Sequence, residues 1–166
     1  GNDNPVVLDV GAGRGLFLFN SSEASPEKNF LGMEINYREG RRAATRLLKA
    51  NRANARVLGG DARIAFDKYI PDSSISEVHV YFPDPWWKKK HHKHRIFTDV
   101  FVNQITKALK NGGELHFWTD VEEYFERVKN LMDHASQFSR REVPDEHFPE
   151  HDMDYQTSFE RKKRNE

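Results

Sequence analysis

A short apolar run that includes Asp9 leads directly into Gly11, Gly13 and Gly15. Glycines at such a place let the backbone turn sharply and approach a ligand without a Cβ in the way. The nicotinamide-binding fingerprint would need its last glycine where Leu16 stands, and no lysine is followed by serine or threonine to complete a phosphate loop. The glycine turn therefore favours a ligand without phosphates.

Two further carboxylates, Glu34 and Asp61, follow later apolar runs. Glu34 stands 19 positions after Gly15, where a carboxylate can accept hydrogen bonds from both hydroxyls of a ribose. Asp61 would lie at the same edge and could accept a hydrogen bond from an adenine amino group. Together they outline an adenosine site. The alternatives are a glycine turn without a ligand, a solvated Glu34, and an Asp61 that caps a helix beginning at Ala62.

The segment 82–88 places Asp84 between two prolines and continues into Trp86, Trp87 and Lys88. The prolines restrict the backbone on both sides of Asp84, so a stiff loop aims its carboxylate, as a catalytic position requires. The tryptophans offer faces for base stacking, and the cations up to Arg95 offer contacts to phosphate. In the alternative interpretation, the tryptophans anchor the core and the cations form a solvated rim.

The elements that must position these residues alternate along the chain. Five strand-like runs are separated by apolar residues at helical spacing, which predicts a doubly wound α/β fold with helices on both faces of a mostly parallel sheet. In this topology the carboxyl ends of the strands meet at one crevice, where ligands bind. The predicted strands are 6–10, 30–35, 56–60, 78–82 and 114–119.

Two segments toward the carboxyl end complete this prediction. Gly112 and Gly113 are expected to close a helix and turn the chain into the strand at 114–119. Beyond them, 143–155 is rich in proline, acid and histidine and predicts a loop, while 157–163 predicts a last strand of the sheet.

Composition narrows the class of protein. The 166 residues fit a single domain, and the absence of cysteine excludes disulfides, cysteine zinc sites and a cysteine nucleophile. No apolar run approaches the roughly 18 residues of a membrane span, and no secretory leader opens the chain, so a cytoplasmic protein is expected.

Because residues 1–4 directly precede a core strand, a native amino-terminal segment is expected to be missing. The net charge of zero argues against bulk attraction to nucleic acid and leaves local basic stretches to contact phosphate.

The order Pro-Asp-Pro-Trp at 83–86, followed by Lys88 and a basic stretch to Arg95, resembles the signature of the tRNA (guanine-N7)-methyltransferase family. The match continues at the Thr-Asp pair at 119–120 and at 157–162, and covers essentially the whole chain in order. The resemblance implies the class I methyltransferase fold, with a doubly wound, seven-stranded, Rossmann-like sheet. It also implies S-adenosyl-L-methionine as cofactor, tRNA as partner, and methyl transfer to N7 of a guanine in the variable loop. It implies no metal and leaves a monomer or a homodimer open.

By the same resemblance, Asp84 is the active-site carboxylate and also a cofactor contact. The family more often has glutamate where Asp9 stands, so the shorter side chain is expected to reach the methionine end of the cofactor through water. Asp120 has a second interpretation, since Asp120 and Glu123 together predict a capping box. The other implied cofactor residues are Asp9, Gly11, Gly13, Glu34, Asp61 and Ala62; the implied substrate residues are Lys88, Asp120, Thr157, Ser158, Phe159 and Glu160.

The chemistry of guanine N7 agrees with this set of residues. N7 carries an in-plane lone pair and no proton, so it can attack a methyl group without a strong base or a covalent intermediate. The protein must supply alignment, which can lower a barrier by roughly 7 to 11 kcal/mol at best. Asp84 could accept hydrogen bonds from guanine N1–H and the exocyclic amino group, which selects guanine over adenine. The rival hypotheses are methylation of an exocyclic amino group and a nonenzymatic tRNA-binding module.

Overall fold

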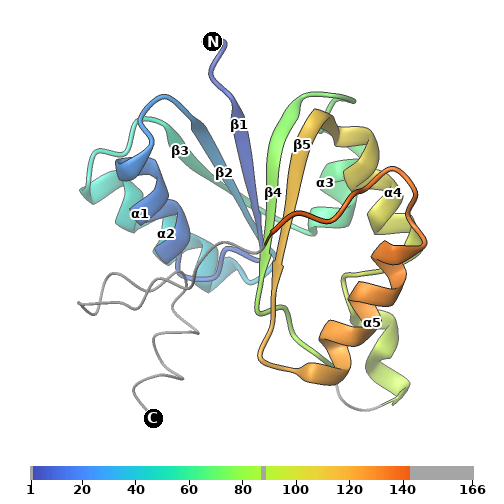
Figure 1. Ribbon diagram of the computed structural model, residues 1–166. Coiled ribbons are helices and arrows are strands. Elements are labelled where there is room, and N and C mark those ends of the chain that lie inside the picture. Colours follow the sequence, from blue (N-terminus) through green and yellow to red (C-terminus); the bar gives the residue numbers. More distant parts are fainter. Residues whose placement is uncertain (1, 87–88, 143–166) are drawn as a thin grey trace.

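The computed structural model describes residues 2–86 and 89–142, whose strands form one parallel sheet (Figure 1). The strand order is β3-β2-β1-β4-β5, with every neighbouring pair parallel. The described residues contain five strands, so the seven expected strands are not confirmed, and the last strand predicted at 157–163 lies outside the described residues. The strands are β1 (Val6–Val10), β2 (Asn29–Glu34), β3 (Ala55–Gly59), β4 (Ile75–Tyr81) and β5 (Leu109–Trp118).

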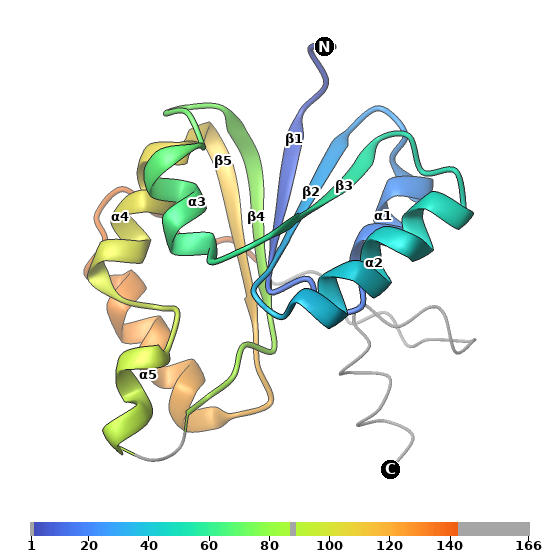
Figure 2. The same cartoon turned by 180° about the vertical axis from the view of Figure 1, so that it is seen from behind.

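Helices cover both faces of the sheet, which confirms the doubly wound arrangement (Figures 1 and 2). One group of helices packs over β1, β2 and β3, and the other lies on the opposite face. Among the described residues, no helix is both long enough and apolar enough to cross a membrane. The first group is α1 (Leu16–Ala24) and α2 (Tyr37–Lys49); the second is α3 (Ala62–Lys68), α4 (Asp99–Ala108) and α5 (Glu122–Asp133), and a 3-10 turn, η1 (Lys89–His94), precedes α4.

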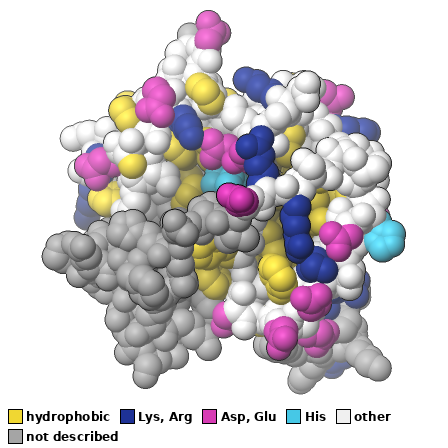
Figure 3. Space-filling view, in the orientation of Figure 1, with side chains coloured by type: hydrophobic (Ala, Val, Ile, Leu, Met, Phe, Trp, Pro, Cys, Tyr) yellow, Lys and Arg dark blue, Asp and Glu magenta, His cyan; other side chains and the backbone are white. Residues whose placement is uncertain are grey.

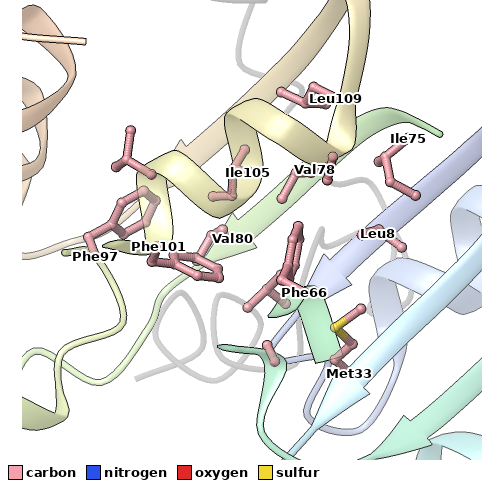
Figure 4. Packing of buried hydrophobic residues seen from close by; sticks show 14 of the residues in the cluster. Leu8, Met33, Phe66, Ile75, Val78, Val80, Phe97, Phe101, Ile105 and Leu109 are labelled. Carbon is pink, nitrogen blue, oxygen red and sulfur yellow. The ribbon is translucent and has the colours of Figure 1, made fainter. Parts of the chain in front are cut away.

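The larger hydrophobic cluster lies under α3, α4 and α5. Leu8, Val78 and Val80 point from the strands toward Phe66 and Phe101, whose rings meet edge to face at 5.4 Å (Figure 4). Each such side chain contributes roughly 1.5 to 3 kcal/mol by leaving water. Because successive strand residues point to opposite faces, the neighbours of these residues belong to the other face, where α1 and α2 cover a smaller cluster.

On the α1 side of β4 and β5, polar side chains replace the apolar ones. In the strand register Glu77 pairs with Glu114 and His79 with His116, and the two imidazole rings stack with their centroids 4.4 Å apart at 3°. Figure 3 shows histidine between acidic and basic side chains near the middle of this face. Burial is the largest influence on the His79 pKa and lowers it, so this ring is neutral near pH 7.

This polar row is held by ion pairs with cations from elsewhere in the chain. Lys28 Nζ lies 2.7 Å from a Glu77 carboxylate oxygen, and Arg141 Nη1 lies 3.7 Å from Glu114. Hydrogen bonds from His79 and Lys28 lower the pKa of Glu77 to about 2, so the carboxylate is ionised. Glu77, His79 and His116 each offer one possible metal-ligand atom, and these atoms lie within 4.8 Å of one another. In the described residues, Glu77 makes an ion pair with Lys28 and a hydrogen bond with His79, so this row is a network of charged and polar contacts.

The start of β5 differs from the prediction. Helix α4 ends at Ala108 and β5 begins at once, so Gly112 and Gly113 do not close the helix. Instead Gly112 has a φ of 76° inside a bulge, where the register moves from the pair Ile75 and Leu109 to the pair Glu77 and Glu114. Glycine adopts this positive φ without the steric cost that a Cβ would bring.

Candidate active site

A cavity of about 420 Å³ opens at the carboxyl ends of β1, β2 and β4. It brings together the glycine turn, the two predicted adenosine carboxylates and Asp84, which come from four separate stretches of sequence. Every described residue that was predicted to contact the cofactor lines this cavity: Asp9, Gly11, Gly13, Glu34, Asp61, Ala62 and Asp84.

The glycine turn is held by its neighbours in the sheet. The amides of Gly11 and Ala12 both donate to the carbonyl of Met33, at 2.8 and 3.0 Å. Gly11 and Gly13 have φ of 80° and 52°, and an added Cβ at Gly11 would meet nothing within 4 Å. That open space is where a ligand can approach the backbone. Gly15 serves packing instead, since a Cβ there would lie 2.7 Å from Cβ of Ala43.

Glu34 is nearly buried and closes β2 with both carboxylate oxygens engaged. One oxygen accepts a hydrogen bond from the Gly13 amide at 2.8 Å, and the other accepts one from the Asn36 amide at 2.7 Å. A carboxylate offers about four lone-pair sites, so each oxygen can accept one more hydrogen bond from a ligand hydroxyl. The prediction of a solvated Glu34 is wrong, because its side chain is fixed between two backbone segments.

Asp9 is the most deeply buried carboxyl group of the cavity, with 3% of its surface exposed. Burial and, to a smaller extent, the charge of Glu34 raise its pKa from 3.8 to about 7. A cationic group placed against Asp9 would reverse this effect by favouring the ionised form. Asp9 therefore suits a ligand that brings a positive charge.

Asp61 fulfils the capping prediction and also lines the cavity. It is the N-cap of α3, and its side chain accepts a hydrogen bond from the Arg63 amide at 2.9 Å. The Arg63 guanidinium donates to both carboxylate oxygens, and this hydrogen bonding lowers the pKa of Asp61. Asp61 is thus ionised near pH 7 and held at the mouth of the cavity beside Ala62.

The loop after β4 is stiffer than its prolines alone would make it. Phe82 and Trp86, on either side of the Pro-Asp-Pro sequence, both have a φ of 48°, a conformation that costs a residue other than glycine about 1 to 3 kcal/mol. The Phe82 amide donates to the carbonyl of Trp118 in β5 at 2.8 Å. These constraints present Asp84 at the rim of the cavity with its side chain exposed.

Arg95 corrects the prediction that the basic stretch contacts phosphate along its whole length. Its side chain is 2% exposed, and its Nε donates to the carbonyl of Pro85 at 2.6 Å. The guanidinium lies 5.2 Å from the centroid of the Tyr124 ring and 3.5 Å from a carboxylate oxygen of Glu123. Arg95 therefore ties the Asp84 loop to α5 and is not available to a phosphate.

Trp86 is part of the cavity wall rather than a core anchor, so the alternative interpretation is wrong for this residue. It is 37% exposed and lines the cavity. Its ring is parallel to that of His91, with centroids 5.8 Å apart, and lies 5.0 Å from that of His94. An aromatic surface of this kind can accept a nucleic-acid base by stacking.

The predicted substrate residues are described only in part. Asp120 is exposed and lies outside the lining of the cavity. The capping box with Glu123 is wrong, because α5 has Val121 as its N-cap and no side-chain cap bond, while Thr119 Oγ1 accepts from the Val121 amide at 3.2 Å. The other predicted substrate residues, Lys88, Thr157, Ser158, Phe159 and Glu160, lie outside the described residues.

Several lining residues were not anticipated. Phe17 and Tyr81 contact each other edge to face at 5.2 Å across the base of the cavity, and Tyr81 follows the apolar alternation of β4. Its position next to Phe82 was the signal that could have identified it. His94 belongs to the basic stretch that was predicted to contact phosphate. Arg63 gives no comparable signal, because it is one of two cations on a short helix.

Solved structures share this sheet and its helices. A precorrin-6y C5,15-methyltransferase from Geobacter metallireducens matches with a TM-score of 0.63 and 15% identity, over 78% of this chain and 61% of that one. A precorrin 8w decarboxylase from Methanobacterium thermoautotrophicum matches with a TM-score of 0.56 and 23% identity, over 78% and 62%. The chain thus has the Rossmann-like fold of the class I methyltransferases.

Sequence relatives identify the family within this class. A family model described as "Putative methyltransferase" matches residues 3–166. A tRNA (guanine-N(7)-)-methyltransferase of Rhodopirellula baltica is 43% identical over 170 residues, which cover 99% of this chain and 63% of that protein. One from Aliivibrio fischeri is 40% identical, with 96% and 67% covered. The chain belongs to the family of the tRNA (guanine-N(7)-)-methyltransferases, and it spans about two thirds of the length of these relatives.

Proposed function

We propose that this chain transfers the methyl group of S-adenosyl-L-methionine to N7 of a guanine in tRNA. The observation that carries the proposal is the single cavity lined both by Glu34 and the glycine turn and by Asp84. A cofactor side and an acceptor side thus share one space. The names of the relatives support this assignment of donor and substrate.

The cofactor side has the groups that an adenosine with a cationic tail requires. Glu34 would accept hydrogen bonds from the ribose hydroxyls with its remaining lone pairs, and Asp61 would accept one from the adenine amino group. The buried carboxyl group of Asp9 would face the charged methionine end. The space beside Gly11 fits a ligand that lies against the backbone. When bound, the sulfonium of S-adenosyl-L-methionine supplies an electrophilic methyl group.

The acceptor side has the groups that a guanine requires. The Asp84 carboxylate would accept hydrogen bonds from N1–H and the exocyclic amino group, which adenine does not offer in that pattern. Its negative charge would also offset the positive charge that develops on the ring as N7 is methylated. Because Arg95 and the strained backbone fix the loop, Asp84 keeps its position when the base arrives. Positioning of this kind replaces the need for a general base.

The first test is to incubate the chain with S-adenosyl-L-methionine and unmodified tRNA, digest the RNA and identify methylated nucleosides by mass spectrometry. The Rhodopirellula baltica relative, assayed in parallel, is the positive control. Formation of 7-methylguanosine is the expected result. A methyl group on an exocyclic amino nitrogen would show a different acceptor, and tRNA binding without any methylated product would show a nonenzymatic module. The cytoplasm is the compartment that we propose for this activity.

A further inference from the structure

Helix α2 carries an unusual concentration of positive charge for a chain whose net charge is zero. Between 37 and 56 there are seven arginines and lysines and a single acidic residue, Glu39. We call six of these cations the α2 basic surface: Arg38, Arg41, Arg42, Arg46, Lys49 and Arg52. None of the six lines the proposed active-site cavity.

The cations of α2 share one face of the helix. Residues three or four apart lie side by side on a helix, so Arg38, Arg42 and Arg46 form one row and Lys49 extends it. The buried residues Gly40, Ala43 and Leu47 define the opposite side, which packs onto the sheet. The stripe therefore points away from the core.

A groove of about 440 Å³ lies along this stripe between α1 and α2, lined by Arg42, Arg46, Lys49 and neighbouring residues. Its inner wall is Phe19, whose ring centroid lies 5.8 Å from the Arg46 guanidinium and 4.8 Å from that of Arg52. Such contacts hold long cationic side chains in place. The groove thus presents cations that lose less conformational freedom when they bind an anion.

The stability of the helix does not explain the whole surface. Arg46 and Lys49 stand in the last turn of α2, where the helix dipole favours cations, but Arg38 stands in the first turn, where the dipole disfavours them. Arg42 pairs with Glu39 at 2.7 Å and Arg52 with Glu23 at 2.6 Å.

Three cations remain available to an external partner. Within 2–86 and 89–142, Arg38, Arg41 and Lys49 make no ion pair. Their side chains are all exposed. A row of solvated cations beside a cationic groove is suited to a partner that carries several negative charges at intervals.

We propose that the α2 basic surface binds phosphate groups of an RNA backbone, outside the cavity that takes the target base. Helix α2 begins three residues after Glu34, at the rim of the cavity, and its 13 residues extend about 20 Å from there. A polynucleotide that places one base in the cavity can therefore reach the stripe with its backbone. The inference rests on the proposed function only for the identity of the RNA.

The test compares two triple variants of the chain. The first removes the exposed cations without ion pairs: Arg38→Gln, Arg41→Gln and Lys49→Gln. The matched control removes three exposed lysines of α3, α4 and β5: Lys68→Gln, Lys107→Gln and Lys110→Gln. Thermal unfolding of both variants checks that each is folded. The affinity for unmodified tRNA is then measured between about 50 and 200 mM KCl, the range over which phosphate contacts lose strength most visibly.

The α2 variant is expected to bind tRNA about 10 to 100 times more weakly at low salt. In a plot of log affinity against log salt concentration, the slope of the α2 variant should be smaller in magnitude by about two to three. Each of the three lost phosphate contacts contributes roughly 0.7 to 0.9 to this slope. The control variant should match the parent. An α2 variant with the parent's slope would overturn the proposal, and so would a control variant with the same loss.

Further measurements distinguish this proposal from the proposed function and from binding to a lipid surface. Turnover at saturating tRNA should be unchanged in the α2 variant while KM rises. If the parent forms no 7-methylguanosine but the slopes still differ, the proposed function fails and the RNA-binding surface stands. If the parent binds vesicles containing phosphatidylserine as tightly as tRNA, and the α2 variant loses both equally, RNA is not the specific partner and the assignment is overturned.

Discussion

The two sides of the cavity hold their carboxylates in opposite ways. On the β1 and β2 side, Asp9 and Glu34 are buried, and glycines provide positive φ without strain. On the β4 side, Asp84 is exposed, and two residues other than glycine, Phe82 and Trp86, adopt positive φ around it. The first side fixes its carboxylates by hydrogen bonds and burial, and the second by the shape of the backbone. The cavity therefore has one wall of buried, hydrogen-bonded carboxylates and one wall with an exposed carboxylate on a constrained loop.

The largest expected effect is on the β4 side. Replacement Asp84→Ala should reduce turnover by about two orders of magnitude or more, because it removes the charge that opposes the developing positive charge. The affinity for S-adenosyl-L-methionine, measured by calorimetric titration, should stay within a few-fold of the parent. The variant Asp84→Asn keeps the size of the side chain but removes its negative charge, so its turnover shows how much the charge alone contributes. Full turnover in the alanine variant would show that the exposed carboxylate is not used.

On the β1 and β2 side, Glu34→Ala should weaken cofactor binding by about 10- to 100-fold, since hydrogen bonds to a charged group contribute roughly 1.5 to 3 kcal/mol. Glu34 also accepts from the Gly13 amide, so Glu34→Gln is the matched control that preserves an acceptor for this bond. Turnover at saturating cofactor should fall far less than for Asp84→Ala. Titration curves that coincide for parent and alanine variant would remove the ribose assignment.

The burial of Asp9 makes a prediction about pH. Its pKa is about 7 in the folded chain and 3.8 as the ordinary value, so the stability that it contributes is complete below pH 3.8 and is lost as the pH rises to about 7. Asp9→Asn removes this dependence. The free energy of unfolding of the variant relative to the parent should therefore increase by about 2 kcal/mol between about pH 5.5 and about pH 8.5. Urea unfolding at the two pH values measures it, and a difference that does not change with pH contradicts the burial of Asp9.

The smallest expected effect concerns Arg95, which acts on Asp84 through the Pro85 carbonyl. Arg95→Met should lower turnover about tenfold at saturating tRNA, because the loop loses a charged hydrogen bond. The affinity for the cofactor should not change. Arg95→Lys, which keeps a donor, should recover part of the turnover. A methionine variant that loses only thermal stability, with the parent's turnover below its melting temperature, would make Arg95 purely structural.

The order of strands and helices, and most of the residues that line the cavity, could be predicted from the sequence. The apolar runs 6–10 and 30–35, which contain Asp9 and Glu34, predict buried parallel strands, and parallel strands bring their carboxyl ends together. The start of β4 was missed, since Ser76 and Glu77 interrupt its apolar run. Glu77 is polar because it belongs to a network with Lys28, which is distant in sequence.

Arg95 shows why side-chain roles are harder to predict than folds. In the sequence it is one more cation in a basic stretch, and solvent exposure is the usual state of arginine. Its burial depends on Tyr124 and Glu123 in α5 and on the Pro85 carbonyl, which are its neighbours in space and not in the local sequence pattern. The capping box of Asp120 and Glu123 was wrong for a related reason: the pattern is local, and in the structure Val121 is the N-cap of α5 and its amide donates to Thr119.

The bulge at the start of β5 has a consequence for how this chain tolerates change. Between the paired positions Ile75 and Glu77 of β4, β5 runs from Leu109 to Glu114, so the surplus length is absorbed at the amino end of the sheet. From the pair Glu77 and Glu114 to the pair Tyr81 and Trp118 beside the cavity, the two strands keep one unbroken register. Insertions around Gly112 would lengthen a protrusion remote from the chemistry, which makes this turn a natural place to graft a peptide tag or a fluorescent label.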